Sequence, residues 1–414
     1  MWEWVLDRIL GACLTEGCVE VIYPSGKRGR YGASGSPVVV KVSSDTALRR
    51  IALNPDLALG EAYMDGTLTI ENDDLEGLLK VAILNTRGRF PFWWWRAVQG
   101  TSMALRWLEQ HAPLHKAKQN VAHHYDLSGE LYDLFLDEDR QYSCAYFPTG
   151  QETLEDAQIA KKHHIAAKLR LEPGMRVLDI GCGWGGMALT LARDYGCHVV
   201  GITLSEEQHK LANQRVHAAG LEDRVDIRLQ DYRNIDEKFD RIVSVGMFEH
   251  VGVPQYRTYF RKVHDLLKPD GVALIHTIGR SAPPSPTSRW ITKYIFPGGY
   301  IPSLSEVAAS IEKEELWMTD VEILRLHYAE TLRHWYDRFM AHEAKVNEIY
   351  DPRFVRMWRY YLKACETTFR YGYQAVFQIQ ITRELDSVPV TRDYIYDGRR
   401  MLEREGAEIH RAAE

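Results

Sequence analysis

The sequence lacks several features that mark particular classes of protein. Its six cysteines are scattered over 414 residues without a C-x-x-C pair, so neither a disulfide framework nor a zinc site is indicated. No apolar run reaches the roughly 18 residues that cross a bilayer. Positive charge is not in excess, and the net charge of −6 argues against a nucleic-acid partner held by bulk charge.

The amino terminus, MWEWVLDRIL, has acidic residues but no basic leader and no cleavage site. We therefore expect no signal peptide and a cytoplasmic protein. Hydrophobic residues make up 45% and charged residues 26%, which predicts an ordinary globular chain of two or three domains. The 11 tryptophans and 22 tyrosines suit surfaces where an apolar region meets water, although a large core explains their number equally well.

One stretch, RVLDIGCGWGG at 176–186, organises the chain. Residues 177–180 predict a buried strand, four glycines predict a turn, and helical periodicity resumes from Met187. A strand–turn–helix order brings helix N-terminal amides to a ligand. The spacing is not G-x-G-x-x-G, and no GK[ST] follows, which disfavours NAD and nucleoside triphosphates. D-x-G-x-G-x-G after a strand resembles the nucleotide loop of S-adenosylmethionine-dependent methyltransferases.

Strands and helices alternate after this loop. Strands are expected at 177–180, 198–202, 225–229, 239–245 and 272–276, with helices at 153–171, 187–193, 205–219 and 256–267. This alternation predicts a parallel sheet whose ligand lies at the carboxyl ends of the strands. Later strands at 324–327 and 375–381 are expected as an antiparallel edge. Polar residues follow five strands and should converge on one crevice.

The first 118 residues predict two further parts. Residues 1–85 indicate a small α+β accessory domain, with strands at 19–23 and 38–42 joined by a glycine-rich loop. Residues 86–118 form an aromatic-rich linker, in which the 90–96 segment, FPFWWWR, interleaves arginine with tryptophan. Such a segment suits a lipid headgroup surface or a packed interdomain helix, and both interpretations stay open.

With these residues in view, the chain resembles the cyclopropane fatty acid synthase family, which includes the mycolic acid cyclopropane synthases. The motifs run in the family's order over about 119–380: HHYDLS, YSCAYF, LDIGCGWGG, GITLS, FDRIVSVGMFEHVG, LIHTIG, KYIFPGGYIPS, HYAETLRHW and FRYGY. LGEAYMDG at 59–66 is similar to the accessory domain of the phospholipid-modifying branch.

The resemblance implies a class I S-adenosylmethionine-dependent methyltransferase, Rossmann-like, with a seven-stranded mostly parallel sheet. The catalytic domain would span 119–400. The implied reaction transfers a methylene from S-adenosylmethionine to a cis double bond of a phospholipid acyl chain. Two rivals stay open: the same fold giving a methyl-branched or hydroxylated chain, and a non-catalytic lipid-binding module.

The resemblance also implies the site residues. Bound bicarbonate would act as the base, held by Cys144, Glu249, His276, Tyr328 and the backbone of Ile278. Cys365 matches a cysteine sometimes singled out in the family, although its place on an amphipathic helix favours packing. His250 is interpreted as structural. No metal is expected.

The expected S-adenosylmethionine ligands come from the strand ends and from YSCAYF. They are Tyr142, Ser143, Asp179, Gly181, Gly183, Thr203, Leu204, Gln208, Asp231 and Tyr232. Where many methyltransferases place an acid on the ribose, this chain has Thr203 with Gln208 nearby. The resemblance further implies membrane phospholipids as partners, a peripheral position at the inner face of the membrane, and a homodimer.

Overall fold

The computed structural model describes residues 1–33, 35–86 and 129–397. The 90–96 segment, the HHYDLS motif and residues 87–118 of the predicted linker at 86–118 therefore lie outside the described residues. No helix within the described ranges is both long and apolar enough to cross a membrane. The proposed boundaries at 85, 118 and 400 stay predictions.

The amino-terminal part is built on a four-stranded sheet of order β2-β1-β3-β4. Its elements are α1 Trp2–Cys13, β1 Cys18–Ile22, β2 Arg28–Gly32, β3 Val38–Val42, α2 Asp45–Leu53, α3 Pro55–Met64, β4 Leu68–Ile70, η1 Glu71–Asp73 and α4 Leu75–Thr86. The expectation of a plain glycine-rich loop between the strands is wrong, because 28–32 pairs antiparallel with β1. Gly29 leaves room for the Tyr31 ring, whose hydroxyl would lie 2.1 Å from a Cβ there.

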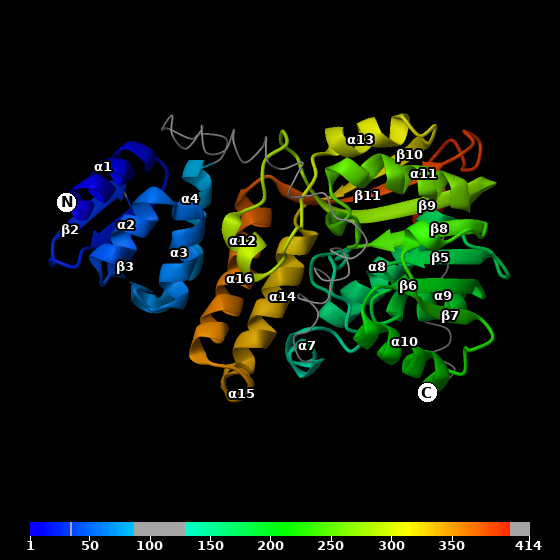
Figure 1. The fold of residues 1–414 in the computed structure, drawn as a ribbon, viewed down its shortest axis with the longest axis horizontal. Helices are drawn as coiled ribbons and strands as arrows, with labels where there is room; N and C mark the ends of the chain where they lie inside the picture. Colours follow the sequence, from blue (N-terminus) through cyan, green and yellow to red (C-terminus); the bar gives the residue numbers. More distant parts are fainter. Residues whose placement is uncertain (34, 87–128, 398–414) are drawn as a thin grey trace.

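The second sheet has seven strands, as expected, in the order β10-β11-β9-β8-β5-β6-β7 (Figure 1). They are β5 Arg176–Ile180, β6 His198–Thr203, β7 Val225–Leu229, β8 Phe239–Val245, β9 Leu267–Arg280, β10 Trp317–Leu324 and β11 Gln374–Thr382. Strands β9, β8, β5, β6 and β7 run parallel, while β11 pairs antiparallel with β9 and with β10. The antiparallel edge is confirmed, but the predicted strand at 324–327 is wrong: β10 ends at Leu324 and His327 already begins a helix.

Helices connect and cover these strands. They are α7 Gly129–Phe135, α8 Leu154–Leu169, α9 Gly186–Tyr195, α10 Glu206–Ala218, α11 Tyr256–Leu266, α12 Arg289–Tyr294, α13 Leu304–Glu312, α14 His327–Ala341, α15 Glu343–Ile349 and α16 Pro352–Tyr371, with short turns η2 Tyr232–Asn234, η3 Phe248–His250 and η4 Val253–Gln255. The side chains of Thr153, Ser205 and Asp351 cap α8, α10 and α16 by accepting backbone N–H bonds. Such caps explain why these helices begin where they do.

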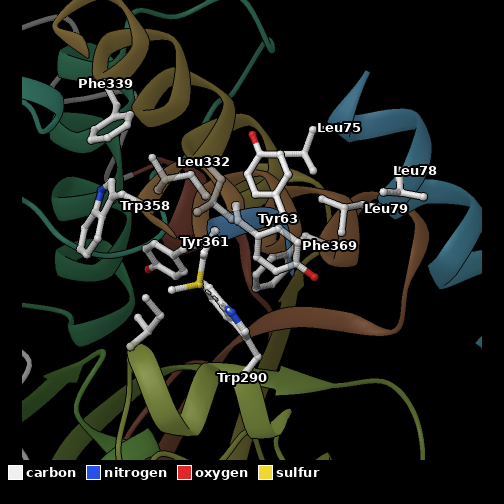
Figure 2. Packing of buried hydrophobic residues seen from close by; sticks show 14 of the residues in the cluster. Tyr63, Leu75, Leu78, Leu79, Trp290, Leu332, Phe339, Trp358, Tyr361 and Phe369 are labelled. Atoms are coloured by element: carbon white, nitrogen blue, oxygen red, sulfur yellow. Dashed lines mark hydrogen bonds between the residues drawn. The ribbon is translucent and has the colours of Figure 1, made fainter. Parts of the chain in front are cut away.

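One hydrophobic core joins the two parts. Figure 2 shows Tyr63, Leu75, Leu78 and Leu79 from the amino-terminal helices packed with Leu332 of α14, Phe369 of α16 and Trp290 of α12, and all seven are buried. The Trp290 indole N–H donates to the Met64 sulfur at 3.2 Å. The position of Gly60 is equally tight, since a Cβ there would lie 2.5 Å from that indole. The accessory part is therefore packed against the segment that leads to Pro297 and Gly298 of the site described below.

Candidate active site

A cavity opens at the carboxyl ends of β5, β6, β7 and β8, where the sequence predicts a ligand. All ten residues expected to bind S-adenosylmethionine line it: Tyr142, Ser143, Asp179, Gly181, Gly183, Thr203, Leu204, Gln208, Asp231 and Tyr232. The walls also include residues of the quoted motifs that the sequence does not predict as ligands, among them Trp184, His250, Pro297 and Gly298. His250, interpreted as structural, is thus part of the wall, and burial lowers its pKa to about 4.

The glycine turn brings backbone to the cavity. Gly181 has φ +82°, a left-handed conformation that side-chain-bearing residues rarely adopt. A Cβ on Gly181 would lie 2.8 Å from Cβ and Cγ of Met247 on the facing loop. Helix α9 begins at Gly186, so its first amides face the cavity, and Met187 lies in the wall.

Asp179 is the penultimate residue of β5, and its buried carboxyl group is 1% exposed. Its Oδ2 has no hydrogen-bond partner among the described residues. Burial raises the pKa of Asp179 to about 7, and the charge of Lys161 opposes that shift. An unpaired carboxyl in a cavity wall is a site for a cationic ligand group, because desolvation makes its charge costly until it is paired.

The other side of the cavity presents an amide, a hydroxyl and a carboxylate. The Thr203 hydroxyl donates to Gln208 Oε1 at 2.8 Å, which leaves the Gln208 amide hydrogens free of that bond. Asp231 accepts from Arg233 Nε at 2.8 Å and Nη2 at 2.7 Å. These polar groups suit a sugar hydroxyl and an amino group, which is the role the sequence predicts for them.

Lys161 is a site residue that sequence reasoning missed. It lies on α8, is fully buried, and donates to Gln141 Oε1 at 2.6 Å and to Ser143 Oγ at 2.8 Å. Burial lowers the pKa of Lys161 to about 8, opposed by Asp137. The lysine thus holds two residues of the cavity wall in place, and no local pattern in its helix indicates this role.

Glu249 lies in the short turn η3, outside the cavity wall as far as the described residues define it. Its Oε1 accepts from the Ile278 backbone N–H at 2.6 Å, whereas Oε2 is buried without a partner in the described structure. Burial raises the pKa of Glu249 to about 7, and the Ile278 bond opposes the shift. The predicted pair of Glu249 and Ile278 is therefore in direct contact.

His276 lies two residues before Ile278 on β9, so both side chains are on the same face of the strand. It is 2% exposed, and burial lowers its pKa well below the usual value, with Lys161 and Lys168 adding to that shift. The ring is therefore neutral. Its Nε2 atom has no partner among the described residues.

The segment that carries Cys144 is bonded to α14, the helix that carries Tyr328. The Ala145 backbone N–H donates to Thr331 Oγ1 at 3.0 Å, and Thr331 stands one helical turn after Tyr328. Burial raises the pKa of the Cys144 thiol, opposed by Lys161. The charge of the same lysine thus lowers the pKa values of Cys144, Asp179 and His276.

Aromatic rings contact Tyr142 and Tyr328. Tyr142 stacks on Trp335 with centroids 5.1 Å apart, and Tyr328 contacts the Trp335 edge and the Phe369 ring. The Tyr142 and Tyr361 hydroxyls lie 2.8 Å apart. Ring faces in a water-poor site stabilise positive charge.

Cys365 does not line the cavity within the described structure. It lies on α16, packs against the core, and burial raises its pKa to about 12, which keeps the thiol protonated. A catalytic role for Cys365 stays a prediction without structural support. The described residues contain no cluster of three or more metal-ligating side chains.

Comparisons with known proteins show the family and the fold of this chain. A mycolic acid cyclopropane synthetase family model matches residues 113–379, and a domain family of unknown function matches 6–90. The chain is 40% identical to the cyclopropane-fatty-acyl-phospholipid synthase of Escherichia coli K12, over 87% of this chain and 92% of that one. It is 38% identical to a probable fatty acid methyltransferase of Pseudomonas putida, over 89% and 94%. The solved structure of mycolic acid cyclopropane synthase CmaA1 with SAH and CTAB has a TM-score of 0.61 at 37% identity, covering 64% of this chain and 97% of that one.

Proposed function

Because this chain belongs to the mycolic acid cyclopropane synthetase family, and is an S-adenosylmethionine-dependent methyltransferase of class I fold, we propose that it is a cyclopropane-fatty-acyl-phospholipid synthase. It would transfer a methylene to the cis double bond of an unsaturated phospholipid acyl chain. One observation supports this most strongly. Glu249 Oε2 and His276 Nε2 are both buried without a hydrogen-bond partner among the described residues, and Glu249 bonds the backbone of Ile278, two residues from His276 on the same strand.

The residues of the cavity fit S-adenosylmethionine, which supplies an electrophilic methyl group when bound. The unpaired Oδ2 of Asp179 suits the ammonium of the methionine part, and the Cβ-free Gly181 admits its close approach. Thr203 and Gln208 would hold the ribose, and Asp231 the adenine amino group. The ligand's positive charge would favour the ionised form of Asp179.

The second cluster fits bicarbonate, which supplies a base inside the protein when bound. The unpaired Oε2 of Glu249 is an acceptor for a hydroxyl, and Nε2 of His276 faces no protein partner in the described chain. Cys144, Tyr328 and the Ile278 backbone complete the proposed set. A carboxylate beside an anion is stable only where the anion carries a proton to donate, as bicarbonate does.

The chain's own residues would then serve three tasks. The glycine turn and the cavity walls orient the methyl donor, which lowers the entropic part of the barrier. Tyr142, Trp335 and Phe369 exclude water and stabilise the carbocation that forms on the acyl chain after methyl transfer. Glu249 would accept the hydroxyl proton of a bound bicarbonate at Oε2, and the base that bicarbonate supplies would take the proton that the new methyl group loses when the ring closes.

The proposed reaction has a direct test. Incubating the protein with S-adenosylmethionine and vesicles of monounsaturated phospholipid should add the mass of one methylene to the acyl chain and give upfield cyclopropane protons in the NMR spectrum. The relationship to a probable fatty acid methyltransferase supports one rival, a methyl-branched product. A mass gain without upfield protons would establish that rival. No mass gain would leave a lipid-binding module.

The 90–96 segment supports a peripheral position at the inner face of the membrane. Changing Trp93, Trp94 and Trp95 together to serine should reduce sedimentation with anionic vesicles severalfold, because three amphipathic rings beside arginine are lost. Trp317→Ser, at a half-exposed site on edge strand β10, is the matched control and should sediment normally. Equal sedimentation of both variants would refute the assignment. A homodimer is proposed from family resemblance alone.

A further inference from the structure

A row of buried polar side chains stands behind His276, on the side of the ring away from its unpartnered Nε2. Gln378 on β11 lies directly opposite His276 in the antiparallel register and is fully buried. The Gln378 Nε2 atom is 3.2 Å from His276 Nδ1. Gln378 lies outside the set of residues expected to hold cofactor, bicarbonate or lipid.

Lys168 fixes the orientation of the Gln378 amide. The Lys168 Nζ lies 2.8 Å from Gln378 Oε1, and an ammonium group only donates. The amide oxygen therefore faces Lys168 and the amide nitrogen faces His276. Lys168 is 1% exposed, contacts Glu322 Oε2, and lies 3.7 Å from Asp320 Oδ2, so two carboxylates stabilise its charge.

We propose that Lys168 and Gln378 are positioning residues that hold His276 as the neutral tautomer with its proton on Nε2. The Gln378 amide N–H donates to Nδ1, which must accept through its lone pair. In a neutral imidazole the proton then resides on Nε2. The ring presents a hydrogen-bond donor to the buried site rather than a lone pair.

The effect of this tautomer on bicarbonate binding rests on the proposed function. An oxygen of a bound bicarbonate needs a donor, and the opposite tautomer would place a nitrogen lone pair against it. Burial lowers the pKa of His276 so far that a second proton is not available near neutral pH. The ring therefore supplies a donor only in the tautomer with its proton on Nε2. In metal sites, hydrogen-bond partners of the ligating histidines fix the tautomer in the same way.

The tautomer is measurable in the ligand-free full-length protein. Long-range ¹H–¹⁵N correlation spectra of histidine-labelled protein at pH 8 should show His276 protonated at Nε2, with the signal identified by its loss in His276→Gln. Protonation at Nδ1 in the wild type would overturn the proposal. This spectrum needs neither bicarbonate nor lipid, so it stands apart from the proposed reaction.

Variants test the relay, by which we mean the hydrogen-bonded chain from Lys168 through Gln378 to His276. Gln378→Leu, and Lys168→Met, should each give a mixture with Nδ1 protonation. Gln378→Leu should also raise the bicarbonate concentration for half-maximal activity in carbonate-depleted buffer at least about tenfold, while SAH affinity changes less than about twofold. An unchanged tautomer in both variants would contradict the proposal. Absence of any bicarbonate response in the wild type would refute the proposed base but not the tautomer.

Gln380→Leu is the matched control. Gln380 lies two residues along β11 on the same face, is 1% exposed, and donates to the Lys168 backbone oxygen at 2.5 Å without touching His276. It should change stability but leave the His276 spectrum and the bicarbonate half-saturation as in the wild type. A tautomer change in Gln380→Leu would show that any loss of buried polar groups near Lys168 suffices, and would contradict a specific relay.

Discussion

Replacing Glu249 by glutamine is expected to lower the rate of ring formation at least about 100-fold, the contribution typical of a positioned proton acceptor. Glutamine keeps the shape and the Ile278 hydrogen bond through its amide oxygen, but it cannot take up a proton at the position of Oε2. SAH affinity should be nearly unchanged, because Glu249 does not line the cofactor cavity in the described structure. Product formation by mass spectrometry and SAH binding by calorimetry check the two parts. A fully active Glu249→Gln enzyme would refute the role.

The same variant has a stability signature whose sign follows from burial. The pKa of Glu249 is raised to about 7 in the folded protein from an ordinary value of 4.5. A raised carboxyl pKa contributes stability below the unfolded value, and this stability is lost as pH rises through about 7. Glu249→Gln, which stays neutral, should therefore exceed the wild type at pH 8 by up to roughly 3 kcal/mol in the free energy of unfolding, and match it only at about pH 4 and below.

Turnover should depend on pH in the opposite sense to stability. Asp179 and Glu249 both have pKa values raised to about 7 by burial, and both are needed as carboxylates. The ratio kcat/KM should therefore rise with pH through about 7 in the wild type.

Glu314→Gln is a control for the stability prediction, because it should change the free energy of unfolding at pH 8 in the opposite direction. Burial acts to raise the pKa of Glu314, but Arg257 and Arg261 hold that pKa low. Loss of the Glu314 carboxylate should therefore reduce stability at pH 8.

Gly181→Ala is expected to weaken SAH binding about 100-fold, which corresponds to about 2.7 kcal/mol. The new Cβ would lie 2.8 Å from Met247 and would force either the glycine turn or the facing loop to move. The backbone at φ +82° adds a strain of about 1–2 kcal/mol that also lowers stability. Calorimetric titration with SAH and a denaturant midpoint separate these two effects.

Gly174→Ala is the matched control for this prediction. Gly174 has the same φ of +82°, lies in the turn before β5, and has no atom within 4 Å of the place where a Cβ would lie. It should lose a similar amount of stability and bind SAH normally. Equal loss of SAH binding in both variants would mean that strain alone, rather than the approach of Gly181 to the cavity, explains the effect.

Local patterns predicted much of the fold. Alternation of strands and helices predicted the mostly parallel sheet, and two later apolar runs predicted its antiparallel edge. These elements could be predicted because the apolar pattern of a buried strand and the capping residue of a helix lie within the element or next to it. Two errors have local causes as well. The glycine content of 28–32 hid an edge strand. The apolar residues at 324 and 326 placed the other predicted strand at 324–327, whereas β10 runs over Trp317–Leu324.

The sequence by itself determined the residues at the strand ends, since parallel strands bring their carboxyl ends to one edge and the glycine turn is contiguous. Tertiary structure alone decided which distant groups support them. Lys161 reaches Ser143 from a helix, and Gln378 meets His276 across two strands, 102 residues apart in the chain. Neither residue carries a signal in its own segment, because a buried polar side chain acquires its role from the partner that folding places beside it.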